Sequence, residues 1–276
     1  MMNYKDSNAP IGVFDSGLGG LTALRRLQKD LPCEHLIYFG DTARVPYGGR
    51  DKETLLHFAK TDIALLRSHG VKAILVACGT VSSVILEEIK NDYEIPVVGV
   101  VESAAEAAAN ATRNGCIGIW GTAASIGSGA YAKRLEALGY SNTVAVPCPK
   151  LVPLIEGGHT AADDQEARAA VREYLAPILQ SGADTLILGC THYPLLTEVI
   201  RAEAGEGLTL IDSGAESINT LRDALEERSL LRQSGEGNVR FLVSGDPAEF
   251  ARGGGRFLNQ ELSGKVEQAD AEAFGK

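Results

Sequence analysis

Two cysteines, Cys78 and Cys190, occupy similar places in this sequence. Each ends an apolar run and is followed within two positions by a threonine, Thr80 and Thr191, and His192 follows the second pair. A thiol acts as a base or nucleophile only as a thiolate, which a positive charge or a helix N-terminus favours. A free cysteine is most often a small buried apolar residue, but two in matching places favour chemistry. We therefore expect an active site with two thiol arms.

The elements that must position these thiols alternate along the chain. Short apolar runs alternate with stretches whose apolar residues recur at helical spacing. The expected strands are residues 11–14, 36–39, 73–77, 97–101, 117–120, 143–146, 185–188, 209–211 and 239–243. The expected helices are residues 21–31, 52–68, 104–112, 167–180 and 217–227. This alternation predicts an α/β fold with mostly parallel sheets.

The second half of the chain resembles the first. Residues 11–17 are echoed by residues 117–123, and the two cysteines then follow in the same order. We expect two similar α/β domains related by a pseudo-twofold axis: residues 1–102 together with 213–276, and residues 103–212. Because ligands bind at the carboxyl ends of parallel strands, the active site is expected in the cleft between the domains.

Composition argues against several classes of protein. The 276 residues include 26 Lys+Arg and 36 Asp+Glu, a net charge of −10, which disfavours nucleic acid or an anionic membrane as a partner. The apolar runs fall short of the roughly 20 residues of a membrane span, and the polar residues 1–10 lack a secretory signal. Five cysteines without a CxxC motif indicate reduced thiols, and no zinc-like spacing accompanies Cys190 and His192. We expect a cytoplasmic protein without a metal.

Asp15 and Ser16 stand at the end of the first expected strand. They could hold a cationic amine or orient the nearer thiol. Alternatively, they form a helix N-cap or a turn before the glycine-rich residues 17–20. Those glycines lack the GxGxxG spacing of a dinucleotide loop, so a nucleotide is not expected.

Several motifs together resemble the glutamate racemases, cofactor-independent two-thiol enzymes of the aspartate/glutamate racemase superfamily. The most specific are Phe14-Asp15-Ser16-Gly17-Leu18-Gly19-Gly20, Gly40-Asp41-Thr42-Ala43-Arg44-Val45-Pro46-Tyr47-Gly48, Ala77-Cys78-x-Thr80 and Leu188-Gly189-Cys190-Thr191-His192-Tyr193-Pro194. Weaker matches fall at 98–102, 152–156, 211–213 and 244–247. The resemblance covers nearly the whole chain. It implies interconversion of L- and D-glutamate for peptidoglycan synthesis, without a cofactor, by a cytoplasmic homodimer.

The resemblance also implies a role for each site residue. Cys78 and Cys190 are the two acid/bases, because a weakly acidic α-proton needs a positioned base and its replacement needs an acid on the opposite face. Asp15 assists Cys78, and His192, supported by Glu156, assists Cys190. The substrate-binding set is Asp15, Ser16, Tyr47, Gly48, Thr80, Thr122, Thr191 and His192. Loop packing for Tyr47, and a satisfied polar role for His192, remain alternatives.

One position departs from the family pattern. The pattern around the first cysteine is Ala-Cys-Asn-Thr, and Gly79 stands here in place of the asparagine. An amide that would bind the substrate is missing, a loss of about 1–3 kcal/mol, and the backbone after Cys78 is freer. This predicts a competent but weakened glutamate site whose kcat/KM rises in a Gly79→Asn variant.

Three rival interpretations stay open. A racemase of another amino acid, such as aspartate, would use the same two thiols. A thiol hydrolase or acyl transferase would pair one cysteine with a histidine base, such as Cys190 with His192, and would leave Cys78 without a role. A homologue that binds its ligand without catalysis is kept open by Gly79.

Overall fold

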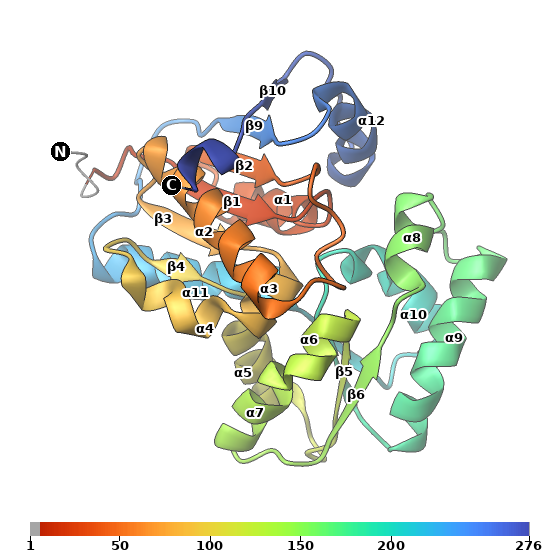
Figure 1. The fold of residues 1–276 in the computed structure, drawn as a ribbon. Helices are drawn as coiled ribbons and strands as arrows, with labels where there is room; N and C mark the ends of the chain where they lie inside the picture. Colours follow the sequence, from red (N-terminus) through yellow and green to blue (C-terminus); the bar gives the residue numbers. More distant parts are fainter. Residues whose placement is uncertain (1–5, 276) are drawn as a thin grey trace.

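The computed structural model describes residues 6–275, so the first five residues of the polar start, and Lys276, lie outside the described part. Two sheets form two halves, one above the other in Figure 1. The first sheet holds β1 (Ile11–Asp15), β2 (Leu36–Gly40), β3 (Ala73–Val76), β4 (Val97–Val98), β9 (Val239–Val243) and β10 (Val266–Gln268). The second holds β5 (Ile117–Gly121), β6 (Thr143–Pro147), β7 (Thr185–Leu188) and β8 (Thr209–Asp212).

Helices flank both sheets (Figure 1). Those before β5 are α1 (Leu21–Asp30), α2 (Lys52–Ser68), α3 (Gly79–Val84), α4 (Leu86–Ile89) and α5 (Val101–Ala111). Those that follow are α6 (Ala123–Ser128), α7 (Ala130–Ala137), α8 (Leu151–Glu156), α9 (Gln165–Gln180), α10 (Thr197–Ala204), α11 (Ser213–Glu227) and α12 (Pro247–Leu258). Three short 3₁₀ helices are η1 (Lys90–Asp92), η2 (Tyr193–Leu196) and η3 (Glu272–Phe274).

The two sheets share one strand order. The first runs β10-β9-β2-β1-β3-β4 and the second β6-β5-β7-β8, with parallel pairing throughout the described strands. The arrangement β2-β1-β3-β4 thus corresponds to β6-β5-β7-β8. This confirms the predicted α/β fold with two similar halves. Cys78 and Cys190 are each the second residue after corresponding strands, β3 and β7.

The central strands are continuous apolar runs because both of their faces are covered. Every residue of β1, β2, β3, β5 and β7 is buried. Helices on both faces of a parallel sheet require such strands, which do not alternate between apolar and polar residues. The carboxyl ends of these rigid strands are therefore firm supports for the loops that follow them.

Side chains at the N-caps set where several helices begin. Asp51, Thr122, Asp164, Asp212 and Asp246 each accept a hydrogen bond from a backbone N–H in the first turn, at α2, α6, α9, α11 and α12 respectively. Such caps satisfy donors that the helix itself leaves free. Because of its cap, α11 begins at residue 213 and not at the predicted residue 217.

The predicted strand at residues 97–101 is too long. The strand β4 ends at Val98, and α5 already begins at Val101. Gly99 packs closely against α4, because an added Cβ would stand only 2.3 Å from Leu86 Cδ2. The backbone turns at this point into α5. The elements named from the sequence did not include β10 or the helices α3, α4, α6, α7, α8, α10 and α12, and none of them lay between residues 247 and 276.

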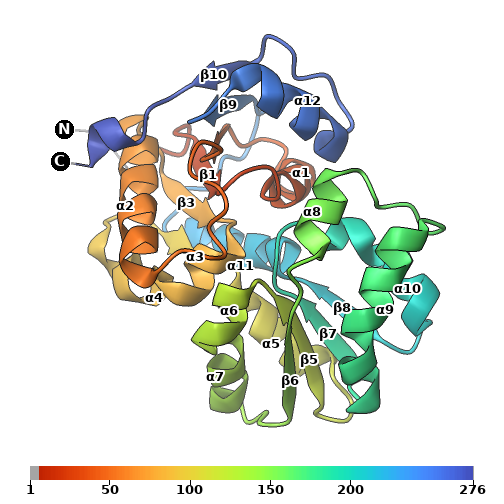
Figure 2. The same cartoon turned by 45° about the vertical axis from the view of Figure 1, so that its right-hand side comes forward.

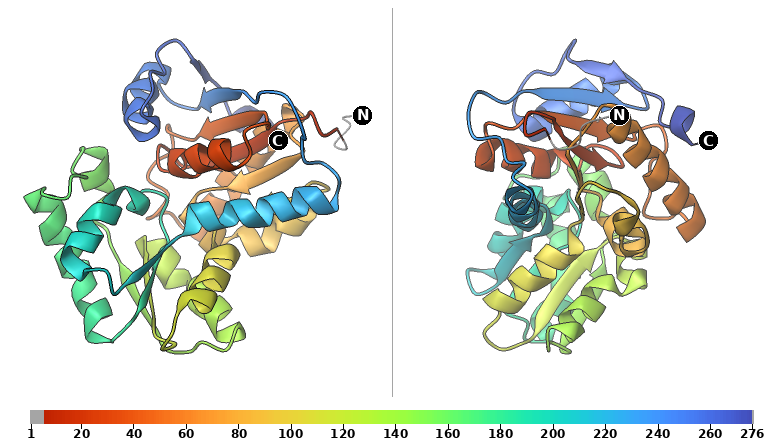
Figure 3. Two further views of the ribbon diagram at one scale, coloured as in Figure 1. Left: turned by 180° about the vertical axis from the view of Figure 1, so that it is seen from behind. Right: turned by 90° about the vertical axis from the view of Figure 1, so that its left-hand side faces the viewer.

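The boundaries between the two halves stay a prediction. Strands of the first sheet come from residues 11–98 and 239–268, and those of the second from residues 117–212. Figure 3 shows α11 crossing the back of the molecule between the two sheets. There α11 contacts both α1 and α5, and Ser103 and Thr220 share a hydrogen bond of 2.8 Å. Among residues 6–275, no helix has both the length and the apolar character needed to cross a bilayer.

Candidate active site

A cavity of about 520 Å³ lies between the two halves and is lined by the loops that follow corresponding strands. We call this cavity the cleft. In Figure 2, α3 of the first half faces α6 and α8 of the second across this region. All eleven residues that the sequence analysis singled out line it: Asp15, Ser16, Tyr47, Gly48, Cys78, Thr80, Thr122, Glu156, Cys190, Thr191 and His192.

Cys78 stands at the start of α3, in the N-cap position, and its side chain is buried. Burial and the charge of Asp15 raise the pKa of the Cys78 thiol to about 12. Hydrogen bonds from the Ser16 side chain, and from N–H groups at the start of α3, act in the opposite direction but are weaker. At neutral pH the free cleft therefore holds Cys78 as a thiol, which can give a proton.

Cys190 lies beside a cation. Its Sγ is 3.8 Å from His192 Nδ1, and His192 Nε2 is 2.9 Å from Glu156 Oε1. Burial alone lowers the pKa of His192, but the hydrogen bonds to Cys190 and Glu156, with the charges of Cys190 and Asp15, raise it to about 10. At neutral pH His192 is therefore an imidazolium that donates to both neighbours. A positive charge beside a sulfur atom is the setting in which a cysteine typically serves as a base.

The two thiol arms differ in local structure as well as in their charged neighbours. The sequence places both cysteines between a strand and a helix, which holds for Cys78 and α3. Cys190 instead precedes Thr191, His192 and the 3₁₀ turn η2, and α10 begins only at Thr197. Near Cys78 the polar neighbours are the N–H groups at the start of α3, whereas near Cys190 the polar neighbour is the side chain of His192.

Asp15 connects the two halves at the floor of the cleft. Its Oδ2 accepts a hydrogen bond from Gly17 N at 2.9 Å, and Thr191 Oγ1 lies 3.5 Å from its Oδ1. It does not cap α1, since Gly20 holds the N-cap position without a side-chain bond. The turn interpretation of Asp15 is therefore the correct local one, and a carboxylate remains beside the Cys78 thiol.

Two threonines meet across the cleft. Thr80 Oγ1 and Thr122 Oγ1 are 3.1 Å apart, one from the start of α3 and the other from the N-cap of α6. The Thr122 hydroxyl also accepts from Ser125 N at 3.1 Å. Hydroxyls of this kind can donate to a carboxylate without adding a charge.

The hydroxyl of Tyr47 faces away from the cleft. It donates to Asp41 and lies 3.1 Å from Asp62 Oδ2, and its side chain is 2% exposed. Arg44 joins the same two carboxylates, with Nε 2.6 Å from Asp41 Oδ2. The Tyr47 hydroxyl is thus engaged with two buried carboxylates, whereas the backbone of the loop at Gly48 lines the cleft. This contact agrees with the packing alternative for Tyr47, and its role toward a substrate stays a prediction.

Three residues surround the Tyr47 hydroxyl: Asp41, Arg44 and Asp62. Asp41 and Arg44 belong to a motif that the sequence analysis quoted, but no role was assigned to them there. Asp62 lies within α2, 18 residues after Arg44, and no local pattern marks it. Burial and the charge of Asp41 raise the pKa of Asp62, while the hydrogen bonds that it accepts from Tyr47 and Arg44 act in the opposite direction. Only the folded chain brings these groups together.

A third thiol, Cys148, also lines the cleft and was not predicted there. It follows β6, where the loop corresponds to that after β2. Its Sγ lies 3.3 Å from Val146 O, and burial raises its pKa. Cys148 is therefore held as a thiol that donates to the backbone, without a cationic partner of the kind that Cys190 has.

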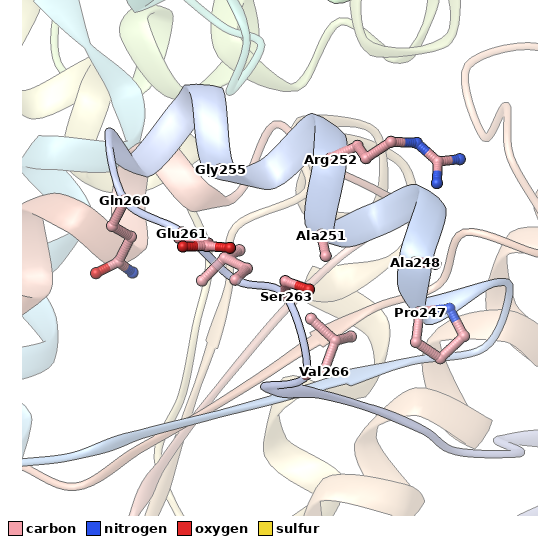
Figure 4. Close-up of a pocket in the computed structure, with 11 residues that line it drawn as sticks. Pro247, Ala248, Ala251, Arg252, Gly255, Gln260, Glu261, Ser263 and Val266 are labelled. Atoms are coloured by element: carbon pink, nitrogen blue, oxygen red, sulfur yellow. The ribbon is translucent and has the colours of Figure 1, made fainter.

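Another cavity, of about 460 Å³, lies between α12 and the segment that leads to β10 (Figure 4). Arg252 and Glu261 are the charged residues among those described around it. None of the described residues that line it is a cysteine, histidine or aspartate. The described lining of this second cavity therefore lacks the thiols and the imidazole that the cleft holds.

The charged side chains that line the cleft in the described part of the chain are two carboxylates and one imidazolium. The titratable groups of the cleft include Asp15, Glu156 and His192 beside the thiols, and none of the described lining residues is lysine or arginine. A carboxylate ligand would therefore be held by hydroxyl and N–H groups, and a cationic amine by Asp15. Such a cleft fits a small zwitterion whose Cα can lie between one thiol from each half.

Comparisons with known proteins give consistent findings. The Asp/Glu/Hydantoin racemase family matches residues 22–221. Glutamate racemase from Geobacter metallireducens is 44% identical over 265 residues, 95% of this chain and 97% of that protein. Among solved structures, glutamate racemase isoform RacE1 from Bacillus anthracis has a TM-score of 0.90 at 35% identity and covers 96% of this chain and 98% of its own. Glutamate racemase from Francisella tularensis, solved in complex with D-glutamate, has a TM-score of 0.88 at 33% identity, covering 97% and 99%.

Proposed function

We infer the reaction of the cleft from one premise: this chain belongs to the Asp/Glu/Hydantoin racemase family and, within it, to the glutamate racemases. The chain interconverts L- and D-glutamate. The observation that supports this function at the level of residues is the pair of thiols in the cleft. One thiol comes from each half, and each follows a corresponding strand.

The proposed reaction moves one proton at each thiol. The Cys190 thiolate, beside the His192 imidazolium, takes the α-proton from one enantiomer, and the C–H electron pair stays on Cα as a carbanion. The Cys78 thiol then gives its proton to the opposite face, which leaves Cys190 as a thiol and Cys78 as a thiolate. The reverse reaction begins from that state. Positioned acids and bases of this kind typically contribute 10²- to 10⁴-fold each in rate.

Neutral donors hold the substrate in this proposal. The hydroxyls of Ser16, Thr80, Thr122 and Thr191, with backbone N–H groups of the loop at Gly48, bind the two carboxylates. Asp15 pairs with the ammonium group and keeps it cationic, which makes the α-proton more acidic. Fixed dipoles in a cavity that excludes most water stabilise developing charge better than water does.

The biological setting is also a proposal. We place the enzyme in the cytoplasm as a homodimer that supplies D-glutamate for peptidoglycan, because the resemblance to glutamate racemases implies this setting. Light scattering that gave the 29.2 kDa mass of one chain at every concentration would contradict the dimer.

The substrate is tested by comparing two amino acids. Circular dichroism should show L-glutamate losing its optical activity without added cofactor, and D-glutamate should do the same in the reverse direction. L-aspartate, which is one methylene shorter, should react at least about tenfold more slowly, since one misplaced methylene is worth roughly 1–3 kcal/mol. Faster turnover of aspartate than of glutamate would favour the rival racemase.

Arg44 is expected to support both stability and substrate affinity. An Arg44→Met substitution leaves Asp41 and Asp62 buried without their cation, which should cost about 3–5 kcal/mol in free energy of unfolding. The loop through Tyr47 and Gly48 should shift, and KM for glutamate should rise. Urea denaturation and initial rates measure the two effects. The control is Arg50→Met, an exposed arginine at the end of the same loop; equal behaviour of the two variants would refute the role of Arg44.

A further inference from the structure

The two cysteine-bearing segments touch through bare backbone. A Cβ added at Gly79 would stand 2.4 Å from the carbonyl oxygen of Gly189 and 3.7 Å from Cys190 Cα. Contacts of a real Cβ are essentially never shorter than 3.0 Å. The residue after the first thiol is thus packed directly against the residue before the second.

The segment 189–192, which carries Cys190, has no room to move away. Gly189 N donates to Trp120 O at 2.9 Å, and a Cβ at Gly189 would itself lie 2.6 Å from that oxygen. On the side of the first half, Thr22 Oγ1 donates to Thr191 O at 2.8 Å. The segment is therefore held from both halves.

A second glycine of the first half packs on the same segment. A Cβ at Gly19 would stand 2.3 Å from Thr191 Oγ1 and 2.4 Å from His192 Nδ1. Two positions without side chains, Gly19 and Gly79, thus enclose the segment that carries Cys190. This independent contact indicates that the first half is shaped to approach the second closely at this place.

The start of α3 is held just as firmly. Ser83 Oγ donates to Gly79 O at 2.6 Å, and Ser82 Oγ donates to Val76 O at 3.0 Å. Ser82 N also donates to Cys78 O at 2.9 Å. With both segments anchored, a side chain at position 79 must push the two halves apart or turn Cys78 away from the substrate.

We propose that Gly79 is a positioning residue that sets the separation of the two thiols, a proposal that rests on the racemase function above. Its missing side chain lets the Cys78 and Cys190 segments meet backbone to backbone. This geometry contradicts the prediction that an asparagine at position 79 would fit and raise kcat/KM. A residue with a Cβ there requires the two segments to lie further apart than they do in this protein.

The size of the effect follows from the distances. Even to reach the 3.0 Å lower limit of real Cβ contacts, Gly189 O and a Cβ at position 79 must separate by roughly 0.6 Å from the 2.4 Å of this structure, since protein interiors are close-packed. Misplacement of reacting groups by about 1 Å can cost on the order of 100-fold in rate. We therefore expect Gly79→Ala to lower kcat for glutamate about 10-fold, and Gly79→Asn about 100-fold, with a smaller change in KM.

The test compares Gly79→Ala and Gly79→Asn with wild type and with Gly127→Ala, a control at an exposed glycine of α6 where a Cβ meets nothing within 4 Å. Racemisation and Cα deuterium incorporation are measured together in D2O, and thermal unfolding is followed by circular dichroism. In the Gly79 variants the substrate should gain deuterium without inversion more often than in wild type, because the thiol that removes the α-proton still exchanges it with solvent while the opposite thiol is displaced. Gly127→Ala should match wild type.

Two results would overturn the proposal. Folded Gly79 variants that racemise glutamate at the wild-type rate would show that the spacing does not depend on this glycine. Variants that fail to fold would show that Gly79 serves the fold and not the thiols. Wild-type enzyme without activity in the same assay would instead contradict the proposed function itself.

Discussion

Replacing either Cys78 or Cys190 by alanine is expected to abolish racemisation of glutamate, with a loss of about 10³-fold or more in kcat. Each thiol serves one face of the substrate, and the reaction in either direction needs both. Among the described residues that line the cleft there is no substitute, since Cys148, the third thiol there, has no cationic partner of the kind that Cys190 has. Circular dichroism with each enantiomer as substrate measures the effect.

Cys33→Ala is the matched control for these variants, because Cys33 is only half-buried and does not line the cleft. It should leave kcat and KM unchanged. Each catalytic variant should also keep the wild-type unfolding midpoint within a few degrees, since the change removes only one sulfur atom. If one of the two single variants retained full turnover, the reaction would need only one thiol and the proposed mechanism would be wrong.

His192→Asn is expected to lower kcat by roughly 10- to 100-fold and to change its pH dependence. The pKa of His192 is raised to about 10, so the imidazolium is present below that pH and is lost as the pH rises through it. Wild-type activity should therefore fall above about pH 10. In the variant no cation stands near Cys190 at any pH, and this alkaline fall should be absent.

A substitution at Glu156 should have a smaller effect on activity than His192→Asn. Glu156 Oε1 accepts from His192 Nε2 at 2.9 Å, and this bond helps to raise the pKa of the imidazole. Glu156→Gln should therefore move the alkaline fall to lower pH while keeping most of kcat. A wild-type profile that stays flat beyond pH 11, or is unchanged by both variants, would refute the role of the imidazolium.

Much of the fold could be predicted from the sequence because its central strands are short apolar runs. The expected strands at β1, β2, β3, β5 and β7 lie within one residue of those in the structure, and all are fully buried. The strand β10 escaped prediction, because it has three residues at the sheet edge, two of them exposed and polar. The helix α12 does carry a local signal, since Asp246 is its N-cap and Pro247 its first residue.

The site was predicted unevenly, for a physical reason. Residues directly after strands could be placed together, because the carboxyl ends of parallel strands share one edge. Long-range contacts could not: neither the partnership of Asp62 with Arg44 nor the contact of Gly79 with Gly189 leaves a local pattern. The sequence showed that Gly79 lacks a side chain, but only the packing shows why none fits.

The most direct test of the central claim, that two opposed thiols transfer protons at Cα, is the position of deuterium after reaction in D2O. The purified protein is incubated with L-glutamate without cofactor. The two enantiomers are then separated, and the deuterium content of each is measured by mass spectrometry. We predict that D-glutamate carries one deuterium at Cα from the first turnovers, while the remaining L-glutamate stays largely unlabelled. Product that keeps its original proton, equal early labelling of both enantiomers, or no exchange at high enzyme concentration would contradict the account.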